Sequence, residues 1–131
     1  MKHTLFLPLA LCACVSMPVP DRITQLLVGR EVVYDGGPDG HNLPDAHRQT
    51  WNADGTTTYH RPGRGLFTGD VKGRWTVEDG KYCAYFGNNT PAERDCWWVS
   101  TSDNGARVRF KKANFELIDF GPDEFNGRFV K

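Results

Sequence analysis

The stretch KGRWTVEDGKYC, residues 72–83, has the pattern of a β-hairpin. Trp75 and Val77 alternate with polar or charged neighbours, which predicts a strand with one apolar face. Asp79-Gly80 is among the strongest short-range signals for a hairpin turn, and a second strand-like run follows it. Gly73 would permit a bend or a close backbone approach where the chain enters the first strand. The stretch therefore predicts two antiparallel strands, with Trp75 in the core.

The same combination of alternation and turn residues recurs along the chain. Asp54-Gly55 and Asn104-Gly105 repeat the turn signal. Ahead of them, Thr24 is expected to cap a short helix that ends at Gly29, and Glu31–Tyr34 is β-branched and strand-like. The predicted hairpins span residues 48–60, 73–86 and 95–112, and a fourth joins 114–120 to 125–131.

About eight strands joined by short turns predict an all-β fold. We expect a single antiparallel meander that forms a closed or nearly closed up-and-down barrel, with a short N-terminal helix. Closure is favoured because the open edges of a sheet invite aggregation. The alternation also predicts one shared core and one wet face. The core set is Trp75, Val77, Val108, Phe110 and Phe129, and the water-facing set is Arg74, Arg107 and Arg109.

The N-terminus has the anatomy of an export signal. A short cationic start precedes an apolar run from Leu5 to Ala13, which is too short to span a bilayer. Leu11 to Cys14 resembles a bacterial lipobox, in which Cys14 is lipidated and becomes the first residue. Ordinary signal-peptidase cleavage is the alternative. We therefore predict a signal peptide over 1–13, a flexible tether over 14–22 and a β-barrel domain over 23–131. The protein would be exported to the bacterial periplasm, with Cys14 as its lipid anchor to the membrane or with no anchor.

The remaining cysteines support export. Once Cys12 is removed and Cys14 carries lipid, Cys83 and Cys96 form an even pair, which in an exported domain is most simply a disulfide. A metal site would need further cysteines or histidines at ligand spacing, and a redox site would need Cys-x-x-Cys. We expect Cα atoms about 4.4–6.8 Å apart, on neighbouring strands.

The chain resembles two groups of β-barrel proteins to different degrees. Lipocalins carry Gly-x-Trp on their first barrel strand, whereas Gly73 and Trp75 follow two or three predicted strands. The wider pattern is similar to small exported bacterial proteins with a lipocalin-like barrel. The matching positions are Leu27 to Gly29, Trp51 with Ala53 to Thr56, Gly73 to Cys83, Cys96-Trp97 and Gly127. This resemblance covers about residues 26–131 and implies a fold, because the shared residues are turn and core residues.

Several function classes are disfavoured. The 16 basic and 16 acidic residues give a formal net charge of zero, which argues against nucleic acid or an anionic surface as the main partner. The serines Ser16, Ser100 and Ser102 do not lie in Gly-x-Ser-x-Gly, and neither a P-loop nor His-Glu-x-x-His is present. We therefore expect no enzymatic activity, no catalytic residues, no cofactor and no metal.

Three sets of residues are candidates for binding. Trp97 and Trp98 must point to opposite faces of one strand, so Trp98 with Leu66 and Phe67 would form an apolar surface or pack under their glycine-rich loop. Arg107 and Arg109 could meet an anionic partner, or could form a solvated face with acidic neighbours. The last set is an Asp/His loop that could hold a divalent ion but is more simply a turn-rich loop: Asp35, Asp39, His41, Asp45 and His47.

These features predict a non-enzymatic exported envelope protein, a binding module for a small apolar ligand or a protein partner. The alternative is an accessory or inhibitor-type interaction protein. A buried apolar cavity open at one end would favour the binding module. A filled barrel with an exposed aromatic patch would favour the interaction protein, and a cleft with convergent carboxylates or histidines would favour an enzyme.

Overall fold

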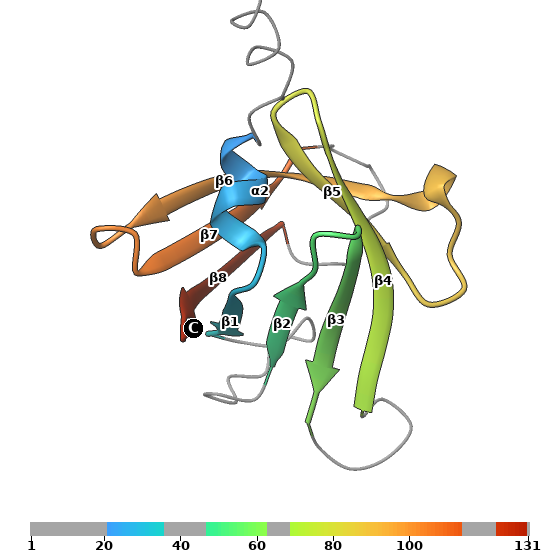
Figure 1. Ribbon diagram of the computed structural model, residues 1–131, viewed down its shortest axis with the longest axis horizontal. Coiled ribbons are helices and arrows are strands. Elements are labelled where there is room, and N and C mark those ends of the chain that lie inside the picture. The colour runs from blue at the N-terminus through green and yellow to red at the C-terminus, as the bar shows by residue number, and fades with distance from the viewer. Residues whose placement is uncertain (1–20, 36–46, 63–68, 114–122, 131) are drawn as a thin grey trace, which may run out of the picture.

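The computed structural model describes residues 21–35, 47–62, 69–113 and 123–130. In these residues eight strands close into a barrel in the order of the sequence, and one short α-helix precedes the first strand (Figure 1). The expected all-β, up-and-down meander with a short N-terminal helix is therefore confirmed.

The elements follow one another with short connections in most places. They are α2 (Arg22–Leu27), β1 (Glu31–Tyr34), β2 (Arg48–Trp51), β3 (Thr56–Arg61), β4 (Gly69–Glu78), β5 (Lys81–Phe86), the 3-10 helix η2 (Pro91–Glu93), β6 (Asp95–Ser102), β7 (Arg107–Lys112) and β8 (Glu124–Phe129). Each strand pairs antiparallel with the next, and β1 pairs with β8 to close the barrel. In this closing ladder Val32 lies opposite Phe129, and Tyr34 lies opposite Gly127.

The β4–β5 turn has the conformation that its sequence predicts. Asp79 and Gly80 both have positive φ angles, 51° and 76°, as a tight two-residue hairpin turn requires. The β6–β7 turn likewise places Asn104 at φ 53° and Gly105 at φ 86°. These local signals therefore set two of the barrel's hairpins.

Two glycines let neighbouring strands approach closely. A Cβ atom on Gly73 would lie 2.6 Å from the Phe86 Cδ1 atom and 2.6 Å from the Tyr85 carbonyl oxygen. A Cβ atom on Gly127 would lie 2.6 Å from Val32 Cγ1. Such distances are not tolerated without a shift of the neighbours, so the predicted close approach at Gly73 is confirmed.

Helix α2 covers one end of the barrel and buries Ile23 and Leu27 in the core. Its cap is Asp21, whose carboxylate accepts hydrogen bonds from Thr24 N at 2.7 Å and from Thr24 Oγ1 at 2.6 Å. The prediction that Thr24 is the cap is therefore wrong, because Thr24 instead supplies a free N–H of the first turn. The helix begins at Arg22, inside the range predicted as tether. Within the described ranges, no helix is long and apolar enough to cross a membrane.

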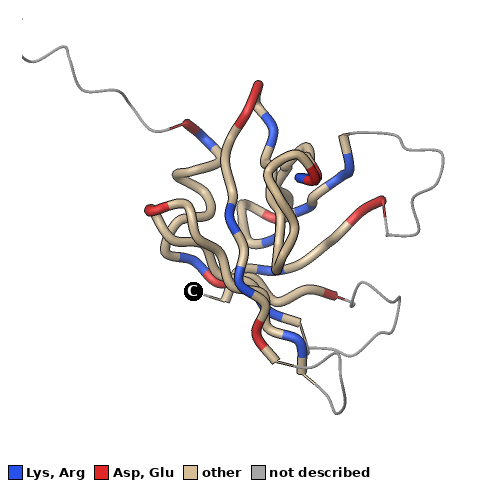
Figure 2. The backbone as a smooth tube through the Cα atoms, turned by 90° about the vertical axis from the view of Figure 1, so that its right-hand side faces the viewer, with Lys and Arg blue, Asp and Glu red and all other residues tan. Residues whose placement is uncertain are grey.

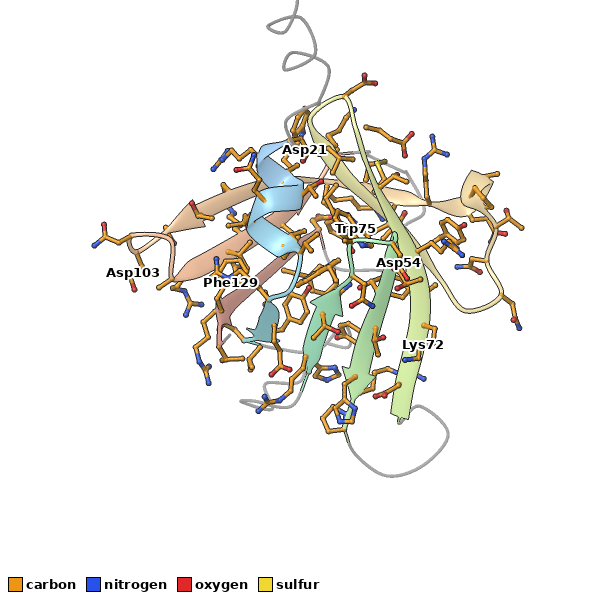
Figure 3. All side chains as sticks on the ribbon, in the orientation of Figure 1. Asp21, Asp54, Lys72, Trp75, Asp103 and Phe129 are labelled. Atoms are coloured by element: carbon orange, nitrogen blue, oxygen red, sulfur yellow. A yellow bond between two sulfur atoms is a disulfide. The ribbon has the colours of Figure 1, made fainter. Side chains whose placement is uncertain are left out.

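The buried core includes five aromatic side chains, those of Tyr34, Trp51, Trp75, Tyr82 and Phe110, of which Trp75 is labelled in Figure 3. Trp75, Val108 and Phe110 are buried as predicted. Val77 and Phe129 pack against this core but stay half-buried, because they lie near the ends of β4 and β8. Of the predicted water-facing arginines, Arg74 and Arg109 are exposed and Arg107 is partly exposed.

The partner of the last strand differs from the prediction. Both edges of β8 are occupied, by β7 and by β1, with Phe110 opposite Phe125 and Val33 opposite Arg128. The predicted pairing of 125–131 with 114–120 is therefore wrong, and residues 114–120 lie outside the described part of the chain. Barrel closure is a long-range event, and it outweighs the local hairpin pattern.

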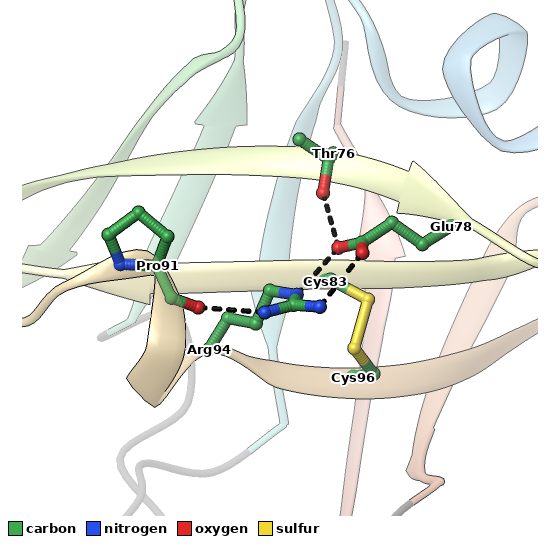
Figure 4. The surroundings of a disulfide bond; sticks show 6 residues. All are labelled: Thr76, Glu78, Cys83, Pro91, Arg94 and Cys96. Atoms are coloured by element: carbon green, nitrogen blue, oxygen red, sulfur yellow. Dashed lines mark hydrogen bonds and ion pairs between the residues drawn. A yellow bond between two sulfur atoms is a disulfide. The ribbon is translucent and has the colours of Figure 1, made fainter.

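The predicted disulfide joins Cys83 of β5 to Cys96 of β6. The two cysteines are direct cross-strand partners, and their Cα–Cα distance of 4.0 Å is shorter than the expected range. The bond lies on the outer face, beside Glu78, which accepts hydrogen bonds from Arg94 Nε at 2.7 Å and from Thr76 Oγ1 at 2.9 Å (Figure 4). A disulfide is compatible with an exported protein.

Candidate ligand-binding site

The two ends of the barrel differ. At the end where β1 begins, α2 packs over the interior, and the Gly29 N–H donates to the Trp51 carbonyl at 3.1 Å. At the end where β1 finishes, no α-helix of the described residues covers the interior. We name this second end, which no α-helix of the described residues covers, the open end.

A network of hydrogen bonds forms the floor beneath this open end. The Tyr34 hydroxyl donates to Gln49 Oε1 at 2.6 Å, and Gln49 Nε2 donates to Thr57 Oγ1 at 2.9 Å and to the Tyr82 hydroxyl at 3.2 Å. Trp51 Nε1 donates to the same Tyr82 hydroxyl at 3.0 Å. Because every one of these buried polar groups has a partner, the network stabilises a fixed arrangement of side chains.

The two tyrosines of the floor are held in their neutral form. Burial raises the pKa of Tyr82 to about 12, although hydrogen bonds from Trp51 and Gln49 act in the opposite direction. Burial also raises the pKa of Tyr34 well above its usual value, assisted by the nearby Tyr82 and Tyr59. Both hydroxyls are therefore suited to hydrogen bonding and poorly suited to proton transfer near neutral pH.

Above the floor lies a small apolar cavity of about 90 Å³. Its lining is aromatic except at Gln49 and Ala84. An engineered cavity of about 150 Å³ admits benzene, so this cavity holds less than one aromatic ring. The lining residues are Tyr34, Gln49, Tyr59, Tyr82, Ala84, Phe86, Trp97, Phe110 and Phe125.

This cavity adjoins a larger pocket at the mouth of the barrel, of about 300 Å³. The two share Tyr59, Ala84, Phe86, Trp97 and Phe125. The rings of Trp97 and Phe125 meet edge to face, with centroids 5.2 Å apart. Pockets for small molecules span about 300–1,000 Å³, so the mouth pocket lies at the small end of that range. We name the mouth pocket together with the adjoining cavity the aromatic pocket.

Polar groups surround the mouth of the aromatic pocket. Arg61, at the end of β3, has a buried Nε atom with no hydrogen-bond partner among the described residues. Glu93 accepts hydrogen bonds from Thr90 N and Oγ1, both at 3.2 Å. Asp95 lies 3.7 Å from Lys112 Nζ. The acidic groups at the mouth therefore have partners of their own.

The predicted aromatic surface is only partly described. Trp97 faces the aromatic pocket, and Trp98 is 51% exposed on the outer face, with Lys81 Nζ 5.3 Å from its ring centroid. The expected opposite orientations of the two tryptophans are confirmed. Leu66 and Phe67 lie outside the described residues, so their place beside Trp98 stays a prediction.

The two arginines predicted to face an anionic partner form ion pairs with acidic residues of the same chain. Arg107 pairs with Asp35, and Arg109 pairs with Glu124. More widely, acidic and basic positions are interspersed along the backbone (Figure 2). These pairs match the alternative of a solvated face with acidic neighbours.

The residues considered for metal binding are not brought together in the described chain. His47 Nδ1 lies 2.9 Å from the Tyr59 hydroxyl, and Asp39, His41 and Asp45 lie outside the described residues. Among described residues, one group of three possible ligand atoms exists, formed by Glu78, Cys83 and Cys96. Both of its sulfur atoms are joined in the disulfide, so neither is a free thiolate.

Of the residues that line the mouth, sequence analysis does not select Arg61, Phe86 or Phe125 as candidates for binding. The available signal was the period of two along β3, which places Thr57, Tyr59 and Arg61 on one face. An arginine at an inward position near a strand end is unusual enough to have indicated a site.

Comparisons of the chain with family models, with curated proteins and with solved structures found no match. The functional proposal therefore rests on the fold and on the aromatic pocket. Together they define a closed, eight-stranded β-barrel with a helix over one end and, in the described residues, an aromatic pocket at the other.

Proposed function

We propose that this protein is a non-enzymatic binding module that holds a small apolar ligand in the aromatic pocket. The carrying observation is the continuous apolar lining that leads from the mouth into the barrel, built by Tyr59, Phe86, Trp97 and Phe125. Aromatic faces and edges give a planar apolar molecule both buried area and favourable ring contacts. The geometry of the lining thus supports ligand binding more than any other role.

The size of the pocket limits the ligand. A molecule with one or two rings fits the mouth pocket of about 300 Å³. The inner cavity of about 90 Å³ accepts only the tip of such a molecule. A long lipid chain would need interior space that the aromatic core occupies. The proposed ligand is therefore a compact molecule.

We further propose that the protein acts in the bacterial cell envelope, as an exported protein. The disulfide between Cys83 and Cys96 and the lipobox-like Leu11 to Cys14 support this location. If Cys14 is the lipid anchor, the mass of the exported protein corresponds to a chain that begins at Cys14 with added lipid. A mature N-terminus beyond Cys14 without lipid would contradict the anchor.

An accessory or inhibitor-type interaction protein is the second candidate. It is favoured by the filled lower part of the barrel and by Trp98, which is 51% exposed on the outer face. The adjacent Trp97 and Trp98 separate the two candidates, because one lines the aromatic pocket and the other lies outside it.

The test is a titration with naphthalene-2-acetamide, a neutral two-ring probe, followed by tryptophan fluorescence and calorimetry. The wild-type protein should bind the probe. Trp97→Ala should weaken binding roughly tenfold, because it removes about 1–1.5 kcal/mol of ring contact. Trp98→Ala is the matched control and should bind as the wild type does.

No binding at millimolar probe would contradict the proposed function. An equal loss of probe affinity in Trp97→Ala and Trp98→Ala would also contradict the proposed function, because of these two tryptophans only Trp97 lines the pocket. Thermal melts of each variant show that the fold is retained.

A further inference from the structure

Arg61 lies inside the mouth of the aromatic pocket. It is the last residue of β3 and shares a strand face with Thr57, which is fully buried, and with Tyr59, which lines the pocket. Arg61 itself lines the mouth pocket together with Phe86 and Trp97. Arg61 therefore brings a positively charged side chain to the mouth of the aromatic pocket.

The Nε atom of Arg61 is buried and has no hydrogen-bond partner among the described residues. A buried donor without an acceptor lowers stability, and more so when the group is charged. Other arginines of the barrel have carboxylate partners: Arg48 Nη1 lies 2.8 Å from Glu31, and Arg94 Nε lies 2.7 Å from Glu78. The unmet donor at Arg61 calls for an acceptor from outside the described chain.

The acidic residues of the same pocket do not supply this acceptor. Glu93 accepts hydrogen bonds from Thr90, and Asp95 lies 3.7 Å from Lys112 Nζ. Because Glu93 leaves one negative charge at the mouth, a polyanion would be repelled there. A single anionic group is the better match to one guanidinium.

We propose that the ligand of the aromatic pocket is an apolar, ring-containing molecule with one anionic group, such as a carboxylate, which pairs with the positively charged side chain of Arg61. The rings then lie against Tyr59, Phe86 and Trp97. This inference rests on the proposed function and adds the chemical class of the ligand. It makes Arg61 the residue that sets the preference for an acid over a neutral molecule of the same shape.

The test compares naphthalene-2-acetate with naphthalene-2-acetamide at pH 7, by calorimetry on the purified protein. The two probes share the rings and differ in charge. A charge-assisted hydrogen bond in a buried site gives a preference of at least about tenfold, so the acetate should bind at least tenfold more tightly than the acetamide.

Arg61→Gln should abolish this preference, so that the variant binds the two probes with affinities within about twofold of each other. Arg61→Lys keeps the charge but not the Nε donor, so a reduced preference is expected. Arg74→Gln is the control, because Arg74 is an exposed arginine of the neighbouring strand β4, and it should keep the full preference. Acetamide binding by each variant also reports that the pocket is folded.

The outcomes separate the two proposals. Equal affinity of both probes for the wild type would overturn the role of Arg61 and leave the proposed function in place. A preference that persists in Arg61→Gln would also overturn it. If neither probe binds, the proposed function fails, and the assignment of an anionic ligand fails with it.

Discussion

Replacing Tyr82 with phenylalanine tests the polar floor of the barrel, because it removes one hydroxyl and keeps the ring. The ring of Tyr82 packs with its centroid 5.4 Å from that of Phe110 and 6.3 Å from that of Trp51. These contacts survive the substitution. Only the hydrogen bonds to the hydroxyl are lost.

At pH 7 Tyr82→Phe should destabilise the protein mainly because Trp51 loses a hydrogen bond. Gln49 Nε2 keeps its bond to Thr57 Oγ1 at 2.9 Å, whereas Trp51 Nε1 loses the one acceptor that it has among the described residues. A buried donor left without a partner costs about 1–3 kcal/mol. We therefore expect Tyr82→Phe to lower the free energy of unfolding by that amount.

At alkaline pH the destabilisation caused by Tyr82→Phe becomes smaller. The unfolded chain releases the Tyr82 proton near pH 10, while the folded chain holds it until pH reaches about 12. The folded state therefore binds more protons in this window, and the stability contributed by Tyr82 is lost as pH rises. Linkage gives a loss of about 1 kcal/mol by pH 11 and about 3 kcal/mol in total, none of which occurs in Tyr82→Phe.

Urea unfolding followed by tryptophan fluorescence at pH 7, 9, 10 and 11 measures both effects. The stability difference between wild type and Tyr82→Phe should narrow by about 1 kcal/mol between pH 7 and pH 11. Tyr85→Phe, which alters a partly exposed tyrosine of the same strand, is the control and should show no comparable loss at pH 7. A constant difference across the series, or no destabilisation at pH 7, would refute the account of the buried floor.

Two further predictions concern packing, and urea unfolding at pH 7 measures both. Trp75→Ala removes a buried core ring and should cost about 3–5 kcal/mol; a variant of unchanged stability that loses ligand binding would instead assign Trp75 to a site. Gly127→Ala places a Cβ 2.6 Å from Val32 Cγ1, so β8 must move away from β1. It should destabilise the barrel by about 1–3 kcal/mol, and a neutral effect would contradict the close approach of these strands.

The parts of the fold that local chemistry determines could be predicted from the sequence. The β4–β5 hairpin follows from Asp79-Gly80, because both residues adopt the positive φ that the turn requires. The opposite orientations of Trp97 and Trp98 follow from the period of two along a strand. The disulfide follows from the even pair that Cys83 and Cys96 form once the predicted signal segment is left out.

The parts that depend on distant segments could not be predicted. The partner of β8 is set by barrel closure, in which Tyr34 of β1 meets Gly127 at the other end of the chain. The helix cap was ambiguous because Asp21 and Thr24 are both good capping residues. The pocket that Arg61 shares with Phe86 and Trp97 depends on side chains from β5 and β6, which are distant from β3 in the sequence.

Nuclear magnetic resonance of the tryptophan indole N–H signals tests the central claim most directly, because Trp97 and Trp98 lie on opposite faces of one strand. Naphthalene-2-acetamide is titrated into labelled protein, and each signal is assigned from the Trp97→Phe and Trp98→Phe variants. Binding in the aromatic pocket predicts a saturating shift of the Trp97 signal and an unchanged Trp98 signal. A shift at Trp98 with none at Trp97, or no saturating shift at either, would contradict the claim that this barrel holds its ligand at the open end.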